Sequence, residues 1–412
     1  MMKPAAGTPP QRASQMRVAY ILDQFPVISQ TFVSDEIFSV REAGVECSIF
    51  ALKESANTAL HPRARALVDA GIVRYAKPCG VLSELGMLTR LLARHPARTI
   101  RTLLKATFDL RFRWCARLAL PIALQIERDD VTHVHAHFAD TAARVAMWVH
   151  RWTGLPFTFT THRYDIFDRP PPDLAEMTRK ADAMVCVSRY NMTYLERTFG
   201  LPAGKMHLIR CGIYGADFAG AFRHPGAACR APRLLCVARL EGSKGHAYLF
   251  AALRQLVDDG LAPILKLAGD GSLRQTLEAE VARLGLADHV EFLGEQTAEQ
   301  VKALFEWCDL SILPSVSESM GLVNMECMAA GRLMIATEVL GVPELVQDRI
   351  TGLLCPPADP AAIARAVQWV LAHPRESAAM VRRGQELVQR EFDRTLCTAQ
   401  LIDLWARSDA RR

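Results

Sequence analysis

The sequence has none of the patterns that build metal or redox sites from cysteine. Its eleven cysteines are scattered along the chain, and no two of them stand at the C-x-x-C spacing. Neither a zinc-binding cysteine cluster nor a redox dithiol is therefore expected. Cysteines without a disulfide framework are typical of a reducing compartment, so we predict a cytoplasmic location.

Long hydrophobic runs are also missing. No window reaches the roughly 18 continuous apolar residues of a membrane span, and no apolar segment follows Lys3 as a signal peptide requires. Residues 1–15 are rich in proline, alanine and polar residues and are expected to form a flexible tail. The net charge of +5 is small; it suits an anionic ligand or surface, and we expect no nucleic-acid partner.

The 412 residues instead alternate short apolar runs with longer amphipathic stretches. This rhythm predicts an α/β protein with parallel sheets and helical crossovers. The predicted strands are 18–22, 47–52, 131–135, 157–161 and 183–187 in the first half, and 233–237, 263–268, 290–293, 310–313 and 333–336 in the second.

The chain length indicates two domains, each with a Rossmann-like, doubly wound sheet. A stretch dominated by glycine, alanine and proline at 212–232 has no clear period and is predicted to contain the linker. We therefore assign a first domain to 16–211 and a second to 212–391. A helix over 392–408 is expected to pack back on the first domain.

The most informative segment runs from 309 to 346. A predicted strand ends there before a loop with Glu318, and a helix that begins near Gly321 carries Glu326. Ligands of open α/β sheets bind beyond the carboxyl ends of strands. The unpaired N–H groups of a helix start suit a phosphate there, glycine lets the phosphate approach the backbone, and each carboxylate accepts hydrogen bonds from sugar or ribose hydroxyls.

Glu318-x7-Glu326 followed by Cys-Met-Ala-Ala-Gly resembles the E-x7-E signature of the family 4 retaining glycosyltransferases, which have the GT-B fold. The segments 234–245, 264–275 and 350–370 resemble other parts of the same family, so the likeness covers nearly all of 232–391. In the first half, the segments FPVISQTFVSDEI, VHAHFAD and FTTHRYDIF resemble the exopolysaccharide branch, of the colanic-acid type. Cys327 stands where alanine is usual, and the first loop lacks the Gly-Gly pair of many relatives.

The resemblance implies two Rossmann-like domains that face a central cleft, with the acceptor on the first and a nucleotide-diphosphate sugar on the second. The implied catalytic residues are His137, Arg239, Lys244 and Glu318. The implied donor-binding residues are Arg239, Lys244, Gly269, Gly294, Glu318, Met320, Gly321, Leu322, Val323 and Glu326. Ser29 and His162 are candidates for contact with the acceptor or the sugar.

The resemblance also implies how the reaction runs. Arg239 and Lys244 would neutralise the leaving diphosphate, Glu326 would bind the ribose, and His137 would support the sugar. The reaction of such enzymes is usually drawn as front-face attack, in which the leaving phosphate oxygen takes the acceptor proton. The chain contains no D-x-D triplet, the metal-holding motif of the other main glycosyltransferase architecture. We therefore expect no metal and no cofactor beyond the nucleotide sugar as co-substrate.

Two alternatives remain open at this point. One is a GT-B nucleotide-sugar epimerase or hydrolase, and the other is a protein that binds nucleotide sugars without catalysis. A nicotinamide dehydrogenase is disfavoured, because the first loop at Asp23–Ser29 contains no glycine.

Residues 82–120 stand apart because seven arginines and Lys105 lie among leucines, phenylalanines and Trp114, opposed only by Glu84 and Asp109. One interpretation is a pair of surface helices that touches an anionic membrane or a polyprenyl-linked saccharide acceptor at the inner face of the cytoplasmic membrane. The other is an ordinary solvated face whose long side chains cover the core of the first domain.

Overall fold

A computed structural model describes residues 16–27, 30–55, 61–77, 79–109, 112–224, 226 and 228–409. The described chain forms two compact units. Unit 1 comprises the described residues of Met1–Val187, Met192–Ile209 and Cys397–Arg412, and unit 2 comprises those of Ser188–Asn191 and Arg210–Leu396. The predicted domain boundary at 212 therefore lies two residues from the point where the chain passes into unit 2.

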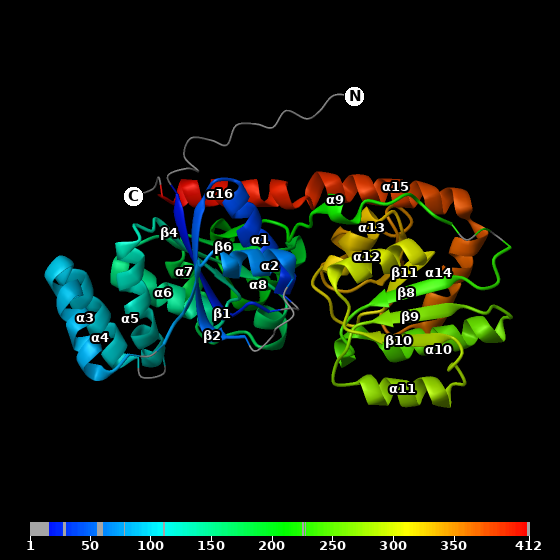
Figure 1. Ribbon diagram of the computed structural model, residues 1–412, viewed down its shortest axis with the longest axis horizontal. Coiled ribbons are helices and arrows are strands. Elements are labelled where there is room, and N and C mark those ends of the chain that lie inside the picture. Colours follow the sequence, from blue (N-terminus) through cyan, green and yellow to red (C-terminus); the bar gives the residue numbers. More distant parts are fainter. Residues whose placement is uncertain are drawn as a thin grey trace, which may run out of the picture. The chain divides into compact units, whose positions relative to one another are not determined.

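Unit 1 contains a parallel sheet in the order β3-β2-β1-β4-β5-β6-β7 (Figure 1). Its strands are β1 (Arg17–Phe25), β2 (Glu46–Glu54), β3 (Val73–Tyr75), β4 (His133–His137), β5 (Phe157–Thr161), β6 (Ala183–Cys186) and β7 (Met206–Leu208). Because β1 has β2 on one side and β4 on the other, the strand order reverses at β1. This reversal is the usual ligand-binding position of such a sheet.

Helices cover both faces of the unit 1 sheet. Their bounds are α1 (Thr31–Glu42), α2 (Pro62–Asp69), α3 (Val81–Arg94), α4 (Pro96–Phe108), α5 (Arg113–Arg128), α6 (Thr141–Thr153), α7 (Leu174–Lys180), α8 (Arg189–Phe199) and α16 (Arg394–Asp409). Alternate β1 residues enter different cores: Ile21 joins the core with α5, α6 and α7, and Tyr20 joins the core with α1, α2 and α16. The apolar residues of a strand buried on both faces divide in this way.

The C-terminal helix packs on the unit 1 sheet. Trp405 is fully buried in the same core as Tyr20, and its indole N–H donates to the Thr158 hydroxyl on β5 at 3.0 Å. A buried indole needs such an acceptor, and β5 supplies it.

Unit 2 contains a second parallel sheet, in the order β10-β9-β8-β11-β12-β13. Its strands are β8 (Arg233–Val237), β9 (Ile264–Ala268), β10 (Val290–Gly294), β11 (Leu310–Leu313), β12 (Leu333–Thr337) and β13 (Leu353–Cys355). Its helices are α9 (Gly215–Phe218), α10 (His246–Asp258), α11 (Arg274–Arg283), α12 (Ala298–Trp307), α13 (Leu322–Ala329), α14 (Pro360–Ala372) and α15 (Pro374–Glu391).

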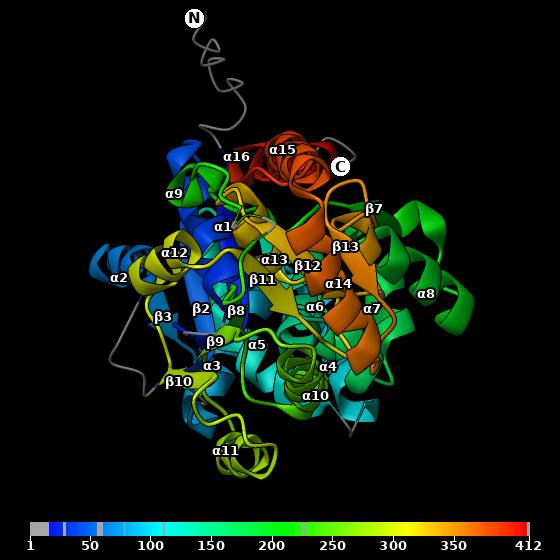
Figure 2. The same cartoon turned by 90° about the vertical axis from the view of Figure 1, so that its right-hand side faces the viewer.

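Two cores lie against opposite faces of this sheet. Leu234 packs with α10, α11 and α14, whereas its neighbour Leu235 packs with α12 and α13. Figure 2 shows the same division, with α12 and α13 on one side of the strands and α10 and α14 on the other. Consecutive side chains of a strand point to opposite faces, so both faces of this sheet are buried.

The structure corrects one predicted strand that matters for the site. We expected a strand at 131–135, but β4 spans His133–His137, so His137 lies inside the strand and does not follow it. The reason is local, because the Val131 N–H bonds to the Ile126 carbonyl at the end of α5 and Val131 thus belongs to that turn. The strands β3, β7 and β13 were not predicted. Each has three residues and lies at the edge of its sheet, too few for a periodic pattern.

None of the helices within the described residues combines the length and the apolar character that crossing a membrane would require.

Candidate active site

The residues predicted to bind the donor gather at one edge of the unit 2 sheet. They follow or end four neighbouring parallel strands: Arg239 and Lys244 after β8, Gly269 after β9, Gly294 at the end of β10, and Glu318, Gly321 and Glu326 after β11. β8 lies between β9 and β11, so the strand order reverses at β8 as well. Its carboxyl end is where an open α/β sheet is expected to bind a ligand.

The loop that carries Lys244 lies directly against the loop that carries Glu318. Gly245 has a φ of +68°, and a Cβ added there would stand 2.1 Å from the Pro314 carbonyl oxygen. Only glycine allows this approach. The Val316 N–H donates to the Ser243 carbonyl at 2.9 Å, and the Lys244 ammonium forms an ion pair with the Glu318 carboxylate. The two side chains are only 15% and 12% exposed.

A second pair of loops holds Arg239. A Cβ on Gly269 would meet the Ala238 carbonyl oxygen at 2.0 Å, so the loops after β8 and β9 are in close backbone contact. The Gly269 N–H donates to the Gly294 carbonyl at 2.8 Å, which brings these two predicted positions together. Arg239 is 56% exposed and pairs with Glu241 at 2.7 Å, so this guanidinium stays accessible to a ligand.

The start of α13 offers backbone N–H groups at the same edge. Gly321 precedes the helix with a φ of +75°, and no side chain caps the helix. The first N–H groups of a helix have no partner within the helix, and they attract anions. Met320 lies buried before this start, and Leu322 and Val323 form the first turn. Glu326, half-buried, lies one turn further along α13.

Several buried polar atoms in these loops and in the adjoining helices have no hydrogen-bond partner within the described part of the chain. They are both ring nitrogens of His246, the Ser315 hydroxyl and the side-chain oxygen of Asn324. Buried polar atoms are almost always paired, so a group of unpaired atoms indicates a place for a bound ligand or water. Burial, and then the charge of Lys244, lowers the pKa of His246 to about 4, so its imidazole is neutral near pH 7.

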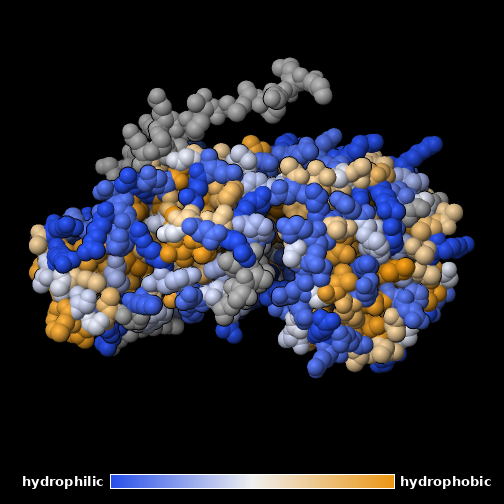
Figure 3. Space-filling model, viewed as in Figure 1, coloured by the Kyte–Doolittle hydropathy of each residue, from blue (hydrophilic) through white to orange (hydrophobic). Residues whose placement is uncertain are grey.

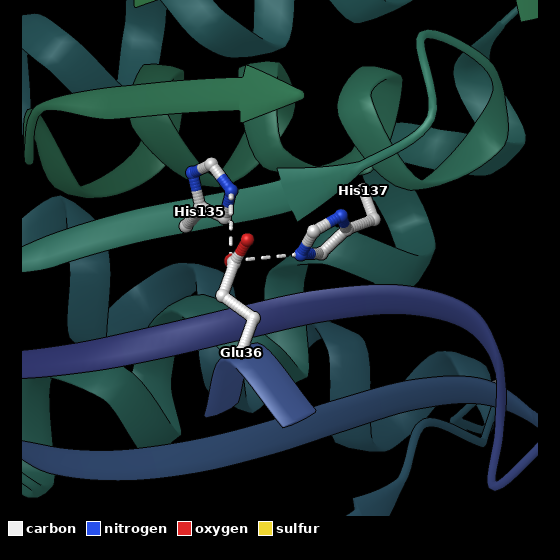
Figure 4. A group of neighbouring side chains, drawn as sticks. All are labelled: Glu36, His135 and His137. Atoms are coloured by element: carbon white, nitrogen blue, oxygen red, sulfur yellow. Dashed lines mark hydrogen bonds and ion pairs between the residues drawn. The ribbon is translucent and has the colours of Figure 1, made fainter. Parts of the chain in front are cut away.

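Unit 1 contributes a second cluster, at the carboxyl ends of β1 and β4. His133, His135 and His137 alternate along β4, so they lie on one face of the sheet. Glu36 on α1 points its carboxylate between two of the imidazoles (Figure 4). Its Oε1 lies 3.0 Å from His137 Nε2 and 3.8 Å from His135 Nε2, and all three side chains are at most 12% exposed.

The hydrogen bonds fix the orientation of His137. An ionised carboxylate only accepts, so Glu36 accepts the Nε2–H proton of His137. The opposite ring nitrogen of His137, Nδ1, lies 3.1 Å from Nε2 of His162, which follows β5. With the His137 proton on Nε2, Nδ1 accepts a hydrogen bond from the Nε2–H of His162. The Tyr20 hydroxyl donates to the same Glu36 oxygen at 3.3 Å, and a carboxylate–histidine pair of this kind holds the ring in one tautomer.

The loops after β4 and β5 are tied together by Asp165. Its carboxylate accepts from the backbone N–H of Ala139 at 2.7 Å and of His162 at 3.0 Å. Burial raises the pKa of Asp165 to about 7, and burial lowers the pKa of His135 and of His162 well below the usual histidine value. Phe138, directly after His137, has a φ of +71°, a conformation uncommon for a bulky residue and frequent at functional sites.

Three atoms of this cluster could hold a metal ion. One ligand atom each from Glu36, His135 and His137 lies within 4.8 Å of the others, and two imidazoles with a carboxylate suit Zn²⁺ or Fe²⁺. The same donors already form hydrogen bonds, because both ring nitrogens of His135 lie within 3.1 Å of threonine hydroxyls. A metal would have to displace these bonds. The expectation of a metal-independent protein stays a prediction.

The structure thus groups most of the predicted residues within their own units. Lys244 and Glu318 contact each other, Gly269 contacts Gly294, and His137 contacts His162. Ser29 lies outside the described residues. Glu36 and His135 were not predicted as site residues, although the spacing of two among the histidines of His-Val-His-Ala-His places them on a common face of a strand.

Two family models match the chain, one in each half. The model for "Glycosyltransferase Family 4" matches residues 30–214, and the model for "Glycosyl transferases group 1" matches residues 222–387. The first match contains the cluster around His137, except for Tyr20, which precedes residue 30. The second match contains the donor-site loops of unit 2.

Curated relatives align along nearly the whole chain. A protein of Escherichia coli K12, provisionally named a colanic acid biosynthesis glycosyltransferase (WcaL), is 27% identical over 94% of this chain and 99% of its own length. The amylovoran biosynthesis glycosyltransferase AmsK of Erwinia amylovora is 24% identical over 95% of this chain and all of its own.

Solved structures share the fold. Anabaena HepE, determined with UDP and glucose, superposes with a TM-score of 0.71 at 19% identity. The alignment covers 95% of this chain and all of HepE.

Proposed function

The chain belongs to the family 4 glycosyltransferases of the GT-B fold, and from this premise we propose that it is a retaining, metal-independent enzyme of cell-surface glycan synthesis. It transfers a glycosyl group from a nucleotide sugar. The names of WcaL and AmsK support an exopolysaccharide or a related surface glycan as the product. The acceptor in this proposal is a saccharide, free or linked to a polyprenyl lipid.

One observation carries the assignment of the donor site. Lys244, Glu318 and the start of α13 meet at the strand-order reversal of unit 2, beside buried polar atoms that find no partner among the described residues. A cation, a carboxylate and the N–H groups of a helix start at such a position suit the charges of a diphosphate and the hydroxyls of a sugar. HepE was determined with UDP, and UDP is therefore a reasonable first ligand to test on this chain.

The proposed reaction breaks the bond from the sugar C1 to the diphosphate oxygen and forms a bond from C1 to the acceptor oxygen. The acceptor proton passes to the leaving phosphate oxygen on the same face of the sugar. Lys244, Arg239 and the α13 N–H groups stabilise the charge that develops on the diphosphate. In this proposal His137 stays held by Glu36, and its Nδ1 exchanges the hydrogen bond from His162 for one from a hydroxyl of the donor sugar.

A thermal-shift screen against UDP-, GDP- and ADP-sugars tests the donor assignment. A ligand at a hundred times its Kd stabilises a protein by about 2.7 kcal/mol, which raises the Tm of a unit of this size by about 5–10 °C. We expect one nucleotide to produce such a shift. No shift with any of them would contradict the proposal, and a shift without transfer to any saccharide acceptor would indicate a non-catalytic binder.

Chelation is expected to leave the transfer rate unchanged. Cations and backbone N–H groups neutralise the diphosphate in the proposed mechanism, so no metal is required. The measurement compares nucleoside diphosphate release before and after treatment with excess EDTA and gel filtration. A large loss of the transfer rate that is reversed by Mg²⁺ or Zn²⁺ would contradict metal independence. Recovery with Zn²⁺ would indicate Glu36, His135 and His137 as the candidate metal ligands.

A further inference from the structure

Helix α4 of unit 1 exposes a stripe of apolar side chains. The side chains that it buries are Thr99 and Thr102, whereas Ile100, Leu104 and Phe108 are 50%, 54% and 82% exposed. A surface helix of a globular protein normally turns its apolar side chains inward and its polar ones outward. The exposed residues follow one another at a spacing of four, so they form one stripe along the helix.

The buried threonines are satisfied by backbone groups. The Thr99 hydroxyl donates to the His95 carbonyl at 2.8 Å, and the Thr102 hydroxyl lies 2.9 Å from the carbonyls of Arg98 and Arg151. The inward face of α4 thus combines these polar contacts with the packing of Leu103 and Ala106 on the core, and the stripe of Ile100, Leu104 and Phe108 lies outside.

Helix α3 also exposes apolar side chains, although Met87 and Leu88 pack against the core. Its one fully buried side chain is Leu91, and Leu82, Leu85 and Leu92 are 87%, 54% and 42% exposed. We call the exposed apolar residues of the two helices the α3–α4 surface. Figure 3 shows hydrophobic side chains gathered over α3 and α4, beside hydrophilic ones. Apolar patches of this kind on a protein surface mark sites of contact with a partner or a membrane.

Cations without acidic partners accompany this surface. Glu84 is engaged by Arg117 and Asp109 by Lys105, and no other acidic residue lies between 82 and 120. Across the part of the chain that the structure describes, Arg90, Arg101 and Arg113 form no ion pair. Exposed leucine, isoleucine and phenylalanine beside unpaired arginine is the composition of a segment that lies on an anionic membrane.

We propose that the α3–α4 surface docks unit 1 on an anionic lipid bilayer, with the apolar stripes in the headgroup–acyl boundary and the arginines against lipid phosphates. A second copy of the chain fits this surface less well. A symmetric contact would bring the arginines of one copy against the same basic surface of the other, and like charges in contact oppose association. A solvated face that covers the core accounts for Leu91 and Leu103, which pack inward, but it does not account for the exposed apolar stripes.

Co-sedimentation of the full chain with vesicles tests this docking. We expect binding to vesicles of phosphatidylcholine mixed with phosphatidylglycerol, weaker binding to phosphatidylcholine alone, and weakening with added salt. The variant with Arg90, Arg101 and Arg113 changed to glutamine should bind the anionic vesicles about a hundredfold more weakly, at roughly fivefold for each charge. The Ile100→Ser/Leu104→Ser variant should lose at least about tenfold on both compositions.

Matched controls lie in unit 2. Ile350 is 50% exposed like Ile100, and Arg382 is exposed, so Ile350→Ser and Arg382→Gln should bind vesicles as the wild type does. All variants should keep the thermal shift with the nucleotide identified above, which separates this proposal from that of the donor site. Absence of wild-type binding, or equal binding by all variants, would overturn the docking. So would a wild-type dimer, seen by light scattering, that the Ile100→Ser/Leu104→Ser change converts to a monomer.

Discussion

The Lys244→Ala variant should transfer sugar about 100- to 1,000-fold more slowly than the wild type, with an intact fold. In the proposed mechanism Lys244 neutralises a leaving group that gains charge in the transition state. The side chain is 15% exposed, so water does not replace its charge well. Arg239→Ala should lower the rate in the same direction. The measurement is kcat for release of the nucleoside diphosphate, with thermal unfolding as the check on the fold.

The ion pair between Lys244 and Glu318 provides a second test of the role of Lys244. Without Lys244, the carboxylate of Glu318 stays largely buried, at 12% exposed, and repels the diphosphate. Glu318→Gln introduced into the Lys244→Ala background should therefore recover part of the lost nucleotide affinity, although Glu318→Gln alone impairs the enzyme. Lys266→Ala is the matched control, because Lys266 pairs with Glu291 elsewhere in the same sheet. A kcat for Lys244→Ala within threefold of the wild-type value would contradict the proposed role of Lys244.

His137→Ala is expected to lower kcat by about 100-fold or more while the nucleotide still binds. His137 belongs to unit 1, whereas the proposed nucleotide contacts belong to unit 2. The thermal shift with the nucleotide should consequently survive His137→Ala and be diminished in Lys244→Ala. Loss of both rate and nucleotide shift in His137→Ala would indicate a damaged fold or a misassigned role.

Variants of Glu36 distinguish a positioning role from a purely structural role in the same cluster. Glu36→Ala removes the acceptor that holds His137 Nε2–H at 3.0 Å, so kcat should fall about 10- to 100-fold with little change in KM. Glu36→Gln keeps an acceptor oxygen at this place and should retain more activity than Glu36→Ala. His95→Ala is the control, because His95 also contacts a glutamate, Glu127, at 3.4 Å on the surface of unit 1. Equal rates for Glu36→Ala and wild type would exclude the positioning role.

Much of the architecture could be read from local patterns. The predicted strands at 157–161, 233–237 and 310–313 coincide with β5, β8 and β11, because each is a short run rich in apolar or β-branched residues with turn signals beside it. The strand at 131–135 was placed two residues early. Its first two residues are apolar or β-branched, but the backbone of Val131 is used to close α5, a contact that the local pattern does not reveal.

Donor-site candidates were easier to find than the cluster around His137. Glu318, Gly321 and Glu326 stand within nine residues of one another, so a spacing motif indicates them. Glu36 and His137 are 101 residues apart and come from a helix and a strand. Their contact depends on β1 pairing with β4, which a single sequence does not specify.

The amino-acid sequence by itself determined the alternation of strands and helices, the two halves, and the glycosyltransferase signature, because each depends on residues that are neighbours in the chain. The tertiary structure alone decided which residues touch over long separations: Lys244 with Glu318, and Glu36 with His137. It also decided the direction of the α4 side chains, with Thr99 and Thr102 inward and Leu104 outward. Periodicity shows that a helix has two faces, but which face meets the core depends on what the rest of the chain packs against it.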